Sequence, residues 1–314
     1  MKHIVNWWKI TKQTFSYFSA SSVPSMSAAL AYYTFFSLAP ILLIVITVCD
    51  VFYGRQAIEG KLFGEIQGFV GADAAHQIQE IIRNAAASHR TLFASVVSAV
   101  ALVFSATGVF TEIQSSINTI WQLKAKPRKG WLKFLLNRVL SLSMVLGLGF
   151  ILLVSLIMSA ALDILMQRLL TVLPEGSVVI AYVINLLLTL VIISFLFGVI
   201  FKLLPDAKIQ WRDVRAGAFA TAILFMLGKF AIGFYLGKSN PGGTYGTAGS
   251  VVIILLWVYY SAMILYFGAC FTKVYAQHTG RQIYPNQYAV FVQHIEVQNH
   301  DSLVEQDKTK VIEK

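Results

Sequence analysis

The 314-residue chain is poor in charged side chains. Asp, Glu, Lys and Arg together make up 13% of it, whereas 57% of its residues are hydrophobic. Soluble domains carry about 25% charged residues, and so few charges cannot cover the apolar surface of a soluble fold of this composition. The scarcity of charge therefore excludes an ordinary soluble domain and indicates that a membrane is the solvent.

Residues that bind metals or catalyse reactions are scarce as well. The two cysteines, Cys49 and Cys270, lie in or next to apolar runs and form no Cys-x-x-Cys pair, so neither a zinc site nor a disulfide framework is expected. The six histidines are scattered, and no Gly-x-Ser-x-Gly, His-Glu-x-x-His or Walker sequence occurs. We therefore expect no enzymatic activity, no metal and no cofactor.

Carboxylates are missing from the middle of the apolar runs. Asp50, Glu112 and Asp163 lie at the ends of predicted spans. Proton relays usually place carboxylates deep in the membrane, so this distribution argues against a proton-coupled transporter of ordinary design.

What the chain has in abundance is long apolar runs. A helix needs about 20 residues to cross a bilayer, and six runs are long enough: residues 27–53, 92–111, 138–163, 178–203, 214–236 and 248–272. Pro40 lies in the first run and is expected to kink its helix, which a membrane bundle tolerates. The predicted fold class is an all-α polytopic membrane bundle, with six transmembrane helices over 27–272 and no β-sheet.

Amphipathic segments accompany these runs. Residues 1–26 mix aromatic side chains with lysines, which is typical of a helix in the membrane interface, although a frayed terminus is an alternative. Residues 55–87 repeat apolar side chains at helical spacing and predict outer amphipathic helices. The second span is expected to continue inward as an amphipathic helix, with one apolar face formed by Ile113, Ile117, Ile120 and Trp121. Residues 273–314 are expected to form a cytoplasmic tail, part of it disordered.

Lys and Arg are unevenly distributed over the connections between the spans. If the N-terminus lies inside, roughly three times as many fall on the inner side as on the outer side. This bias predicts a bacterial plasma-membrane protein with both termini in the cytoplasm. It also explains the net charge of +10, because the basic run KAKPRKGWLK is more typical of contact with anionic lipid headgroups than of RNA binding. Nucleic acid is therefore not an expected partner.

Lys229 is the charged residue that lies well inside a predicted span. It follows Arg215 by about 21 Å along a helix at 1.5 Å per residue, which places it in the outer leaflet. The amine can snorkel to the surface. It can instead join a polar layer that faces the bundle interior and receives an anionic headgroup, with partners at comparable depth in other spans: Asn185, Ser98, Ser155 and Trp257.

The outer connection NPGGTYGTAGS, residues 240–250, is rich in glycine. Gly243, Gly246 and Gly249 recur at every third position around Tyr245, which suits a tight hairpin and a close approach of helices. A nucleotide is not an expected ligand, because no Walker lysine follows and the predicted topology places the loop outside the cytoplasm.

The inner connection LLPDAKIQWRDVRAGAF contains Asp206, Arg212 and Asp213. Asp213 is expected to cap the fifth span, where a carboxylate suits the positive end of a helix. A gating ion pair is the alternative interpretation of this loop.

Four sequence segments together resemble the YihY/BrkB family of bacterial inner-membrane proteins over about residues 20–280. They are SAALAYYTFFSLAPILLI, INTIW, LLPDAKIQWRDVRAGAFATAILFMLGKFAIGFY and YGTAGSVVIILLWVYYSAMILYFGACFT. The resemblance implies six transmembrane helices and cytoplasmic ends. It places Lys229 on the family's Gly-Lys pair and Tyr245 on its Tyr-Gly pair. Cys270 stands where many relatives carry glutamate, which puts in doubt any mechanism that depends on that acid.

Three functions compete. The preferred one is movement of a lipid, or another amphiphile with an anionic headgroup, through the layer around Lys229. A non-transporting scaffold for envelope proteins, or an assembly with a second copy of the chain, is the alternative. A membrane-bound hydrolase or ribonuclease, which the ribonuclease BN label of some relatives suggests, is the least favoured, because the clustered histidines and acids of a metal-dependent nuclease are missing.

Overall fold

The computed structural model describes residues 7–53, 63–64, 67, 75–80, 108–125, 177–238, 249–286 and 289–292. Side chains are described for these except 39–53, 125, 177–182, 184–185, 233–238 and 250. The predicted span 138–163, most of the predicted span 92–111 and most of the outer segment 55–87 lie outside these residues. Within the described part, the protein is mainly helical.

Helices α1 (Trp7–Ala20) and α2 (Val23–Tyr53) are joined by a two-residue turn. Ser22 adopts a left-handed conformation, with φ of 47°, and its carbonyl accepts hydrogen bonds from the amides of Ser25 and Met26. This geometry ends α1 and starts α2 within two residues. Helix α2 then continues through Pro40 as one element.

Three helices are long and apolar enough to cross a membrane within the described residues. They are α7 (Ser177–Leu203), α8 (Trp211–Lys238) and α10 (Gly249–His278). Their candidate membrane spans, Leu186–Leu203, Trp211–Ile232 and Val251–His278, overlap the last three predicted runs. The described chain therefore confirms a helical protein with several apolar spans, and six transmembrane helices stay a prediction.

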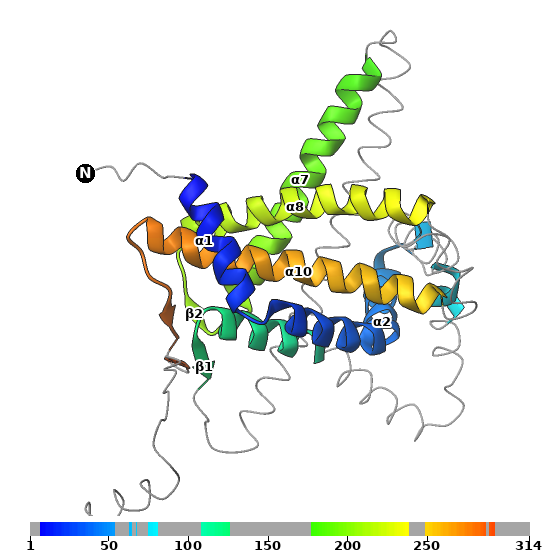
Figure 1. Ribbon diagram of the computed structural model, residues 1–314. Coiled ribbons are helices and arrows are strands. Elements are labelled where there is room, and N and C mark those ends of the chain that lie inside the picture. Colours follow the sequence, from blue (N-terminus) through cyan, green and yellow to red (C-terminus); the bar gives the residue numbers. More distant parts are fainter. Residues whose placement is uncertain are drawn as a thin grey trace, which may run out of the picture.

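Helix α10 lies at the centre of the described bundle. It packs against α8 on one side and α2 on the other, while α1 crosses it (Figure 1). Helix α7 packs against α8 and then extends away from this layer. Large, fully buried side chains come from many of these elements and meet at one end of the bundle, among them Ile10, Val23, Ile117, Trp121, Phe201, Val214 and Tyr266.

Two small antiparallel sheets lie at that same end, so the prediction that the protein has no β-sheet is wrong. Strand β1 (Leu123–Ala125) pairs with β4 (Ala289–Phe291), and β2 (Ala207–Lys208) pairs with β3 (Tyr284–Pro285). Strands of two or three residues are too short to show a period-two pattern in the sequence. They fold part of the predicted tail 273–314 back onto the bundle, and α10 itself continues to His278.

Helices α8 and α10 are locked together by two reciprocal contacts between glycine and threonine. A Cβ atom added to Gly217 would lie 1.8 Å from Thr272 Oγ1, and one added to Gly268 would lie 1.8 Å from Thr221 Oγ1. Each threonine hydroxyl donates a hydrogen bond to the glycine carbonyl four residues earlier in its own helix. Glycine is therefore required at both positions for the two backbones to approach this closely.

Candidate functional site

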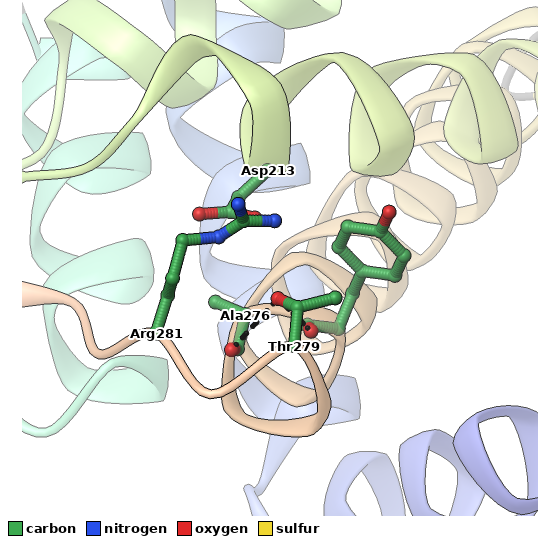
Figure 2. Close-up of polar contacts among 5 residues, drawn as sticks. Asp213, Ala276, Thr279 and Arg281 are labelled. Atoms are coloured by element: carbon green, nitrogen blue, oxygen red, sulfur yellow. Dashed lines mark hydrogen bonds and ion pairs between the residues drawn. The ribbon is translucent and has the colours of Figure 1, made fainter. Parts of the chain in front are cut away.

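An ion pair joins the start of α8 to the turn after α10. Gly280, with φ of 71°, ends α10 in a Schellman motif: the Gly280 amide donates to the carbonyl of Gln277 and the Arg281 amide to that of Ala276. This turn directs Arg281 at Asp213, with 2.8 Å between Nη2 and Oδ1 (Figure 2). Asp213 is 2% exposed and lies in the first turn of α8, where its charge suits the positive helix end.

A second polar contact holds the connection between α7 and α8. The Asn118 side chain donates to Asp206 Oδ2 and accepts from the Asp206 amide, both at 2.9 Å. The Asp206 carbonyl in turn accepts from the Asn286 amide, next to β3. One asparagine thus fixes both the side chain and the backbone of Asp206, and with them the loop that starts α8.

Lys273 forms the third contact, near the C-terminal end of α10. Its Nζ donates to the Tyr17 hydroxyl at 2.7 Å and to the Ile120 carbonyl at 3.1 Å, and it lies 4.5 Å from the centre of the Tyr17 ring. Burial raises the pKa of Tyr17 to about 12, so its hydroxyl stays protonated and also donates to Ile120. One turn away, Trp121 Nε1 donates to the Ala269 carbonyl at 3.0 Å.

We call these three contacts the polar junction, defined by Tyr17, Asn118, Asp206, Asp213, Lys273 and Arg281. They join α1, the helix of residues 108–120, the α7–α8 connection, α8 and α10. Each charged group in the junction is held by a named partner, which is the arrangement that buried polar groups need. The chemistry of the junction is therefore structural: it fixes helix ends relative to one another.

Exposed aromatic and basic side chains, which we call the rim, lie on α1 and at the start of α8, two of the elements that the polar junction joins. The aromatic members, Trp7, Trp8 and Trp211, are 58%, 78% and 49% exposed. The exposed basic members are Lys9, Lys12, Arg212 and Arg215. Exposed tryptophans beside Lys and Arg are typical of a membrane–water interface, and positive charge is typical of the cytoplasmic side.

Helix α8 also presents an exposed apolar face that carries two cations. Arg215 and Lys229 are exposed, and at 3.6 residues per turn they lie about 40° apart around the helix and about 21 Å apart along it. The exposed residues between and beside them are Phe219, Ile223, Leu227 and Phe230. We call this surface the α8 track. The α8 track thus holds two positive charges about 21 Å apart along one stretch of exposed apolar surface.

The predicted polar layer is only partly described. Lys229 is exposed on α8 within the described part of the chain, and Trp257 is half-buried with its ring centre 6.0 Å from that of Phe225. Asn185 belongs to α7, with its side chain outside the described set. Ser98 and Ser155 lie outside the described residues, and so the layer as a whole stays a prediction.

The two predicted loops differ in how far they are described. In the outer hairpin, Gly249 is buried at the first position of α10, whereas Gly243, Tyr245 and Gly246 lie outside the described residues. In the inner loop, Asp206 and Asp213 both join the polar junction. Arg212 is exposed and belongs to the rim.

Several residues of the site escaped the sequence analysis. The sequence analysis assigned no role to Asn118 or Arg281. Asn118 is the most polar residue of INTIW, and Arg281 follows a glycine at a helix end. Glu112 and Ser116 have the i, i+4 spacing that brings side chains together on a helix, and they lie beside Tyr266. Within the described chain, no group of three His, Cys, Asp or Glu residues is arranged to hold a metal ion.

Comparison with known proteins agrees with this architecture. The family model described as Virulence factor BrkB matches residues 14–289. The chain belongs to this family. The match spans every described helix except the first half of α1, and it confirms the resemblance found in the sequence.

The curated relatives of this BrkB-family chain are named as membrane proteins. A UPF0761 membrane protein of Pseudomonas paraeruginosa is 30% identical over 80% of the chain and 59% of its own length. Those of Ralstonia nicotianae and Azotobacter vinelandii are 25% and 29% identical, over 79% and 81% of the chain and 54% and 60% of their own lengths. The chain thus spans little more than half the length of these relatives. No solved structure matches it.

Proposed function

We propose that this BrkB-family protein moves an anionic amphiphile, with a phospholipid as the simplest case, across the bacterial inner membrane. The observation that supports the proposal is the α8 track, where Arg215 and Lys229 lie on one exposed apolar face about 21 Å apart. An anionic headgroup can exchange one cation for the other along this face, while its acyl chains stay against Phe219, Leu227 and Phe230. The headgroup can therefore reach both cations along the helix surface without passing through a closed cavity.

The test is lipid scrambling in liposomes that contain the full chain. Phosphatidylglycerol with a fluorophore on an acyl chain is the probe, and dithionite bleaches the label that reaches the outer leaflet. We expect the wild type to scramble this lipid well above the protein-free rate. Lys229→Gln lowers the rate about tenfold, because the outer cation of the track is lost, whereas Lys229→Arg keeps most of it.

Lys208→Gln is the matched control, since Lys208 is exposed on β2 and lies outside the α8 track. A labelled phosphatidylcholine, with a zwitterionic headgroup, should move more slowly than phosphatidylglycerol. The proposal fails if the wild type scrambles neither lipid faster than protein-free liposomes, or if Lys229→Gln behaves like Lys208→Gln.

We also propose that both chain termini lie in the cytoplasm, which the rim of tryptophan and basic residues supports. Cys270 is fully buried, and Cys49→Ser removes the other cysteine, so that the background for labelling is unreactive. A cysteine introduced by Lys12→Cys, on the exposed side of α1, should react with a membrane-impermeant maleimide only after the inner membrane is permeabilised. Labelling of intact spheroplasts would reverse the assigned orientation.

A scaffold for envelope partners is the second candidate. The small sheets favour it, because Tyr284, Val290 and Phe291 are 56%, 37% and 52% exposed at the end of the bundle that carries the polar junction, where a partner could pack. We propose no enzymatic activity, because Asp206 and Asp213, the acids of the inner loop, are both engaged by Asn118 and Arg281. If the protein is a scaffold, Val290→Asp should abolish its function in cells. The purified wild type should then scramble no lipid.

A further inference from the structure

The ring of Tyr260, from α10, lies in the space that a side chain at residue 228 of α8 would fill. Gly228 is buried. A Cβ atom added to it would overlap Cε1 and the hydroxyl oxygen of Tyr260 and would lie 2.7 Å from its Cζ. These three atoms belong to the hydroxyl end of the phenol. The tyrosine therefore reaches across from α10 and places its hydroxyl against the backbone of α8.

This contact belongs to the same helix packing as the glycine–threonine pairs. From Gly217 to Gly228 the contact moves eleven residues along α8, and from Thr272 to Tyr260 it moves twelve residues back along α10. The two helices thus keep one antiparallel register over about 16 Å, at 1.5 Å per residue. The position of the Tyr260 hydroxyl on α8 is therefore set by the packing of two long helices.

Lys229 follows Gly228 directly and is exposed. Successive helical residues differ by about 100° and 1.5 Å, so the lysine leaves α8 at nearly the height of Gly228 and about a quarter of a turn around the helix. About one turn away, Phe225 of α8 and Trp257 of α10 have ring centres 6.0 Å apart, which adds an aromatic contact between the same helices. An ammonium group on α8 and a phenol from α10 are thus held at one level of the bundle.

A cation and a phenol at one level suit a phosphodiester. This anion shares one negative charge between two non-bridging oxygens. A lysine ammonium has three N–H donors and no acceptor, and a tyrosine hydroxyl donates one hydrogen bond. Hydrogen bonds to a charged acceptor are stronger than those between neutral groups. Because the phenol is already fixed against Gly228, little freedom is lost when it binds the anion.

We propose that Tyr260 binds the lipid headgroup together with Lys229, its hydroxyl donating to one phosphodiester oxygen while the ammonium group donates to the other. The inference rests on the transport function proposed above and deepens it, because it names a second headgroup ligand and the chemical class of the headgroup. Leu227 and Phe230, the exposed apolar neighbours of Lys229 on α8, can contact acyl chains at the same time. This arrangement favours a lipid over a free phosphodiester.

Native mass spectrometry of the full chain in detergent, titrated with phosphatidylglycerol, measures binding without requiring transport. We expect Tyr260→Phe to weaken the binding of this lipid about tenfold, because a hydrogen bond to a charged group is lost. Tyr259→Phe is the matched control. Tyr259 is the adjacent residue of α10 and is also half-buried, but Tyr260 supplies the three atoms nearest to a Cβ at Gly228. The control should bind phosphatidylglycerol as the wild type does.

A double-mutant cycle distinguishes a shared ligand from a general effect on packing. If both residues hold one headgroup, Tyr260→Phe should weaken binding less when Lys229→Gln is already present than it does alone. The unfolding temperature of Tyr260→Phe should match that of the wild type, since the ring beside Gly228 remains. Equal binding by the wild type and Tyr260→Phe, or additive losses in the double variant, would overturn the proposal.

Soluble glycerophosphoglycerol, which has the phosphodiester but no acyl chains, tests the assignment of the ligand as a lipid. At equal concentration it should leave the binding of phosphatidylglycerol unchanged. Displacement of the lipid by this compound would mean that Lys229 and Tyr260 take a free phosphodiester, and it would overturn the assignment.

Lipid scrambling in liposomes separates this inference from the proposed function. Tyr260→Phe should slow phosphatidylglycerol several-fold, and Tyr259→Phe should leave its rate unchanged. If the wild type binds the lipid through both residues but scrambles none, the transport function fails and the headgroup site stands. If scrambling depends on Lys229 but not on Tyr260, the transport function stands and the role assigned to Tyr260 fails.

Discussion

The polar junction and the α8 track carry similar charged residues in opposite surroundings. In the junction, Asp213 is 2% exposed and pairs with Arg281 at 2.8 Å. On the track, Arg215 and Lys229 are exposed on an apolar face. Burial makes the junction charges costly to leave unpaired, whereas exposed charges contribute little to stability. The difference indicates that charges at the junction serve folding, whereas the charges on the track lie where a ligand in the membrane can reach them.

Removal of Arg281 is expected to have the largest effect on stability. Arg281→Met leaves the Asp213 carboxylate buried and unpaired, which costs about 3 kcal/mol. Asp213→Asn should cost less, because Arg281 is 24% exposed and its charge can reach water. Thermal unfolding in detergent, followed by tryptophan fluorescence, compares the two variants. Equal losses would show that the pair is solvated and that the junction is not a buried structural site.

The sequence could predict the charge at the start of α8 but not its partner. An acid in the first turn of a helix follows from local rules, and Asp213 lies in the first turn of α8. Its pairing with Arg281 depends on the left-handed turn at Gly280 and on the pairing of β3 with β2. In the sequence, the turn and β3 follow Asp213 only after the rest of α8 and the whole of α10. No local pattern carries that information.

The same limit explains the missed strands. Hydropathy finds α7, α8 and α10 because a span of about 20 apolar residues is a strong signal. Strands of two or three residues have no such signal.

The contact between α8 and α10 predicts the second largest loss of stability. Gly268→Ala places a Cβ atom 1.8 Å from Thr221 Oγ1 and 3.0 Å from the Phe201 ring. Relief of this overlap requires the helices to separate, at a cost of about 2 kcal/mol. Gly198→Ala is the matched control, since its Cβ would lie 3.8 Å from Ala218 in ordinary contact. Similar unfolding temperatures for the two variants would mean that the helices separate without cost.

A single hydrogen bond in the junction should have a smaller effect. Trp121→Phe keeps most of the buried ring but removes the donor to the Ala269 carbonyl, so we expect a loss of about 1 kcal/mol. The same thermal assay measures it. A loss as large as that of Arg281→Met would indicate that packing of the indole ring, rather than its N–H group, holds the helix of residues 108–120 against α10.

Lys229→Gln should have the smallest effect on stability and a large one on activity. The side chain is exposed on α8, and substitutions at such positions usually change stability by less than about 0.5 kcal/mol. Its unfolding temperature should therefore match that of the wild type, while the rate of phosphatidylglycerol scrambling falls about tenfold. Arg281→Met should give the converse result, with low stability but wild-type scrambling by the fraction that remains folded. If Lys229→Gln instead lowers the unfolding temperature as much as Arg281→Met does, the lysine contributes to folding, and the distinction between track and junction does not hold at that position.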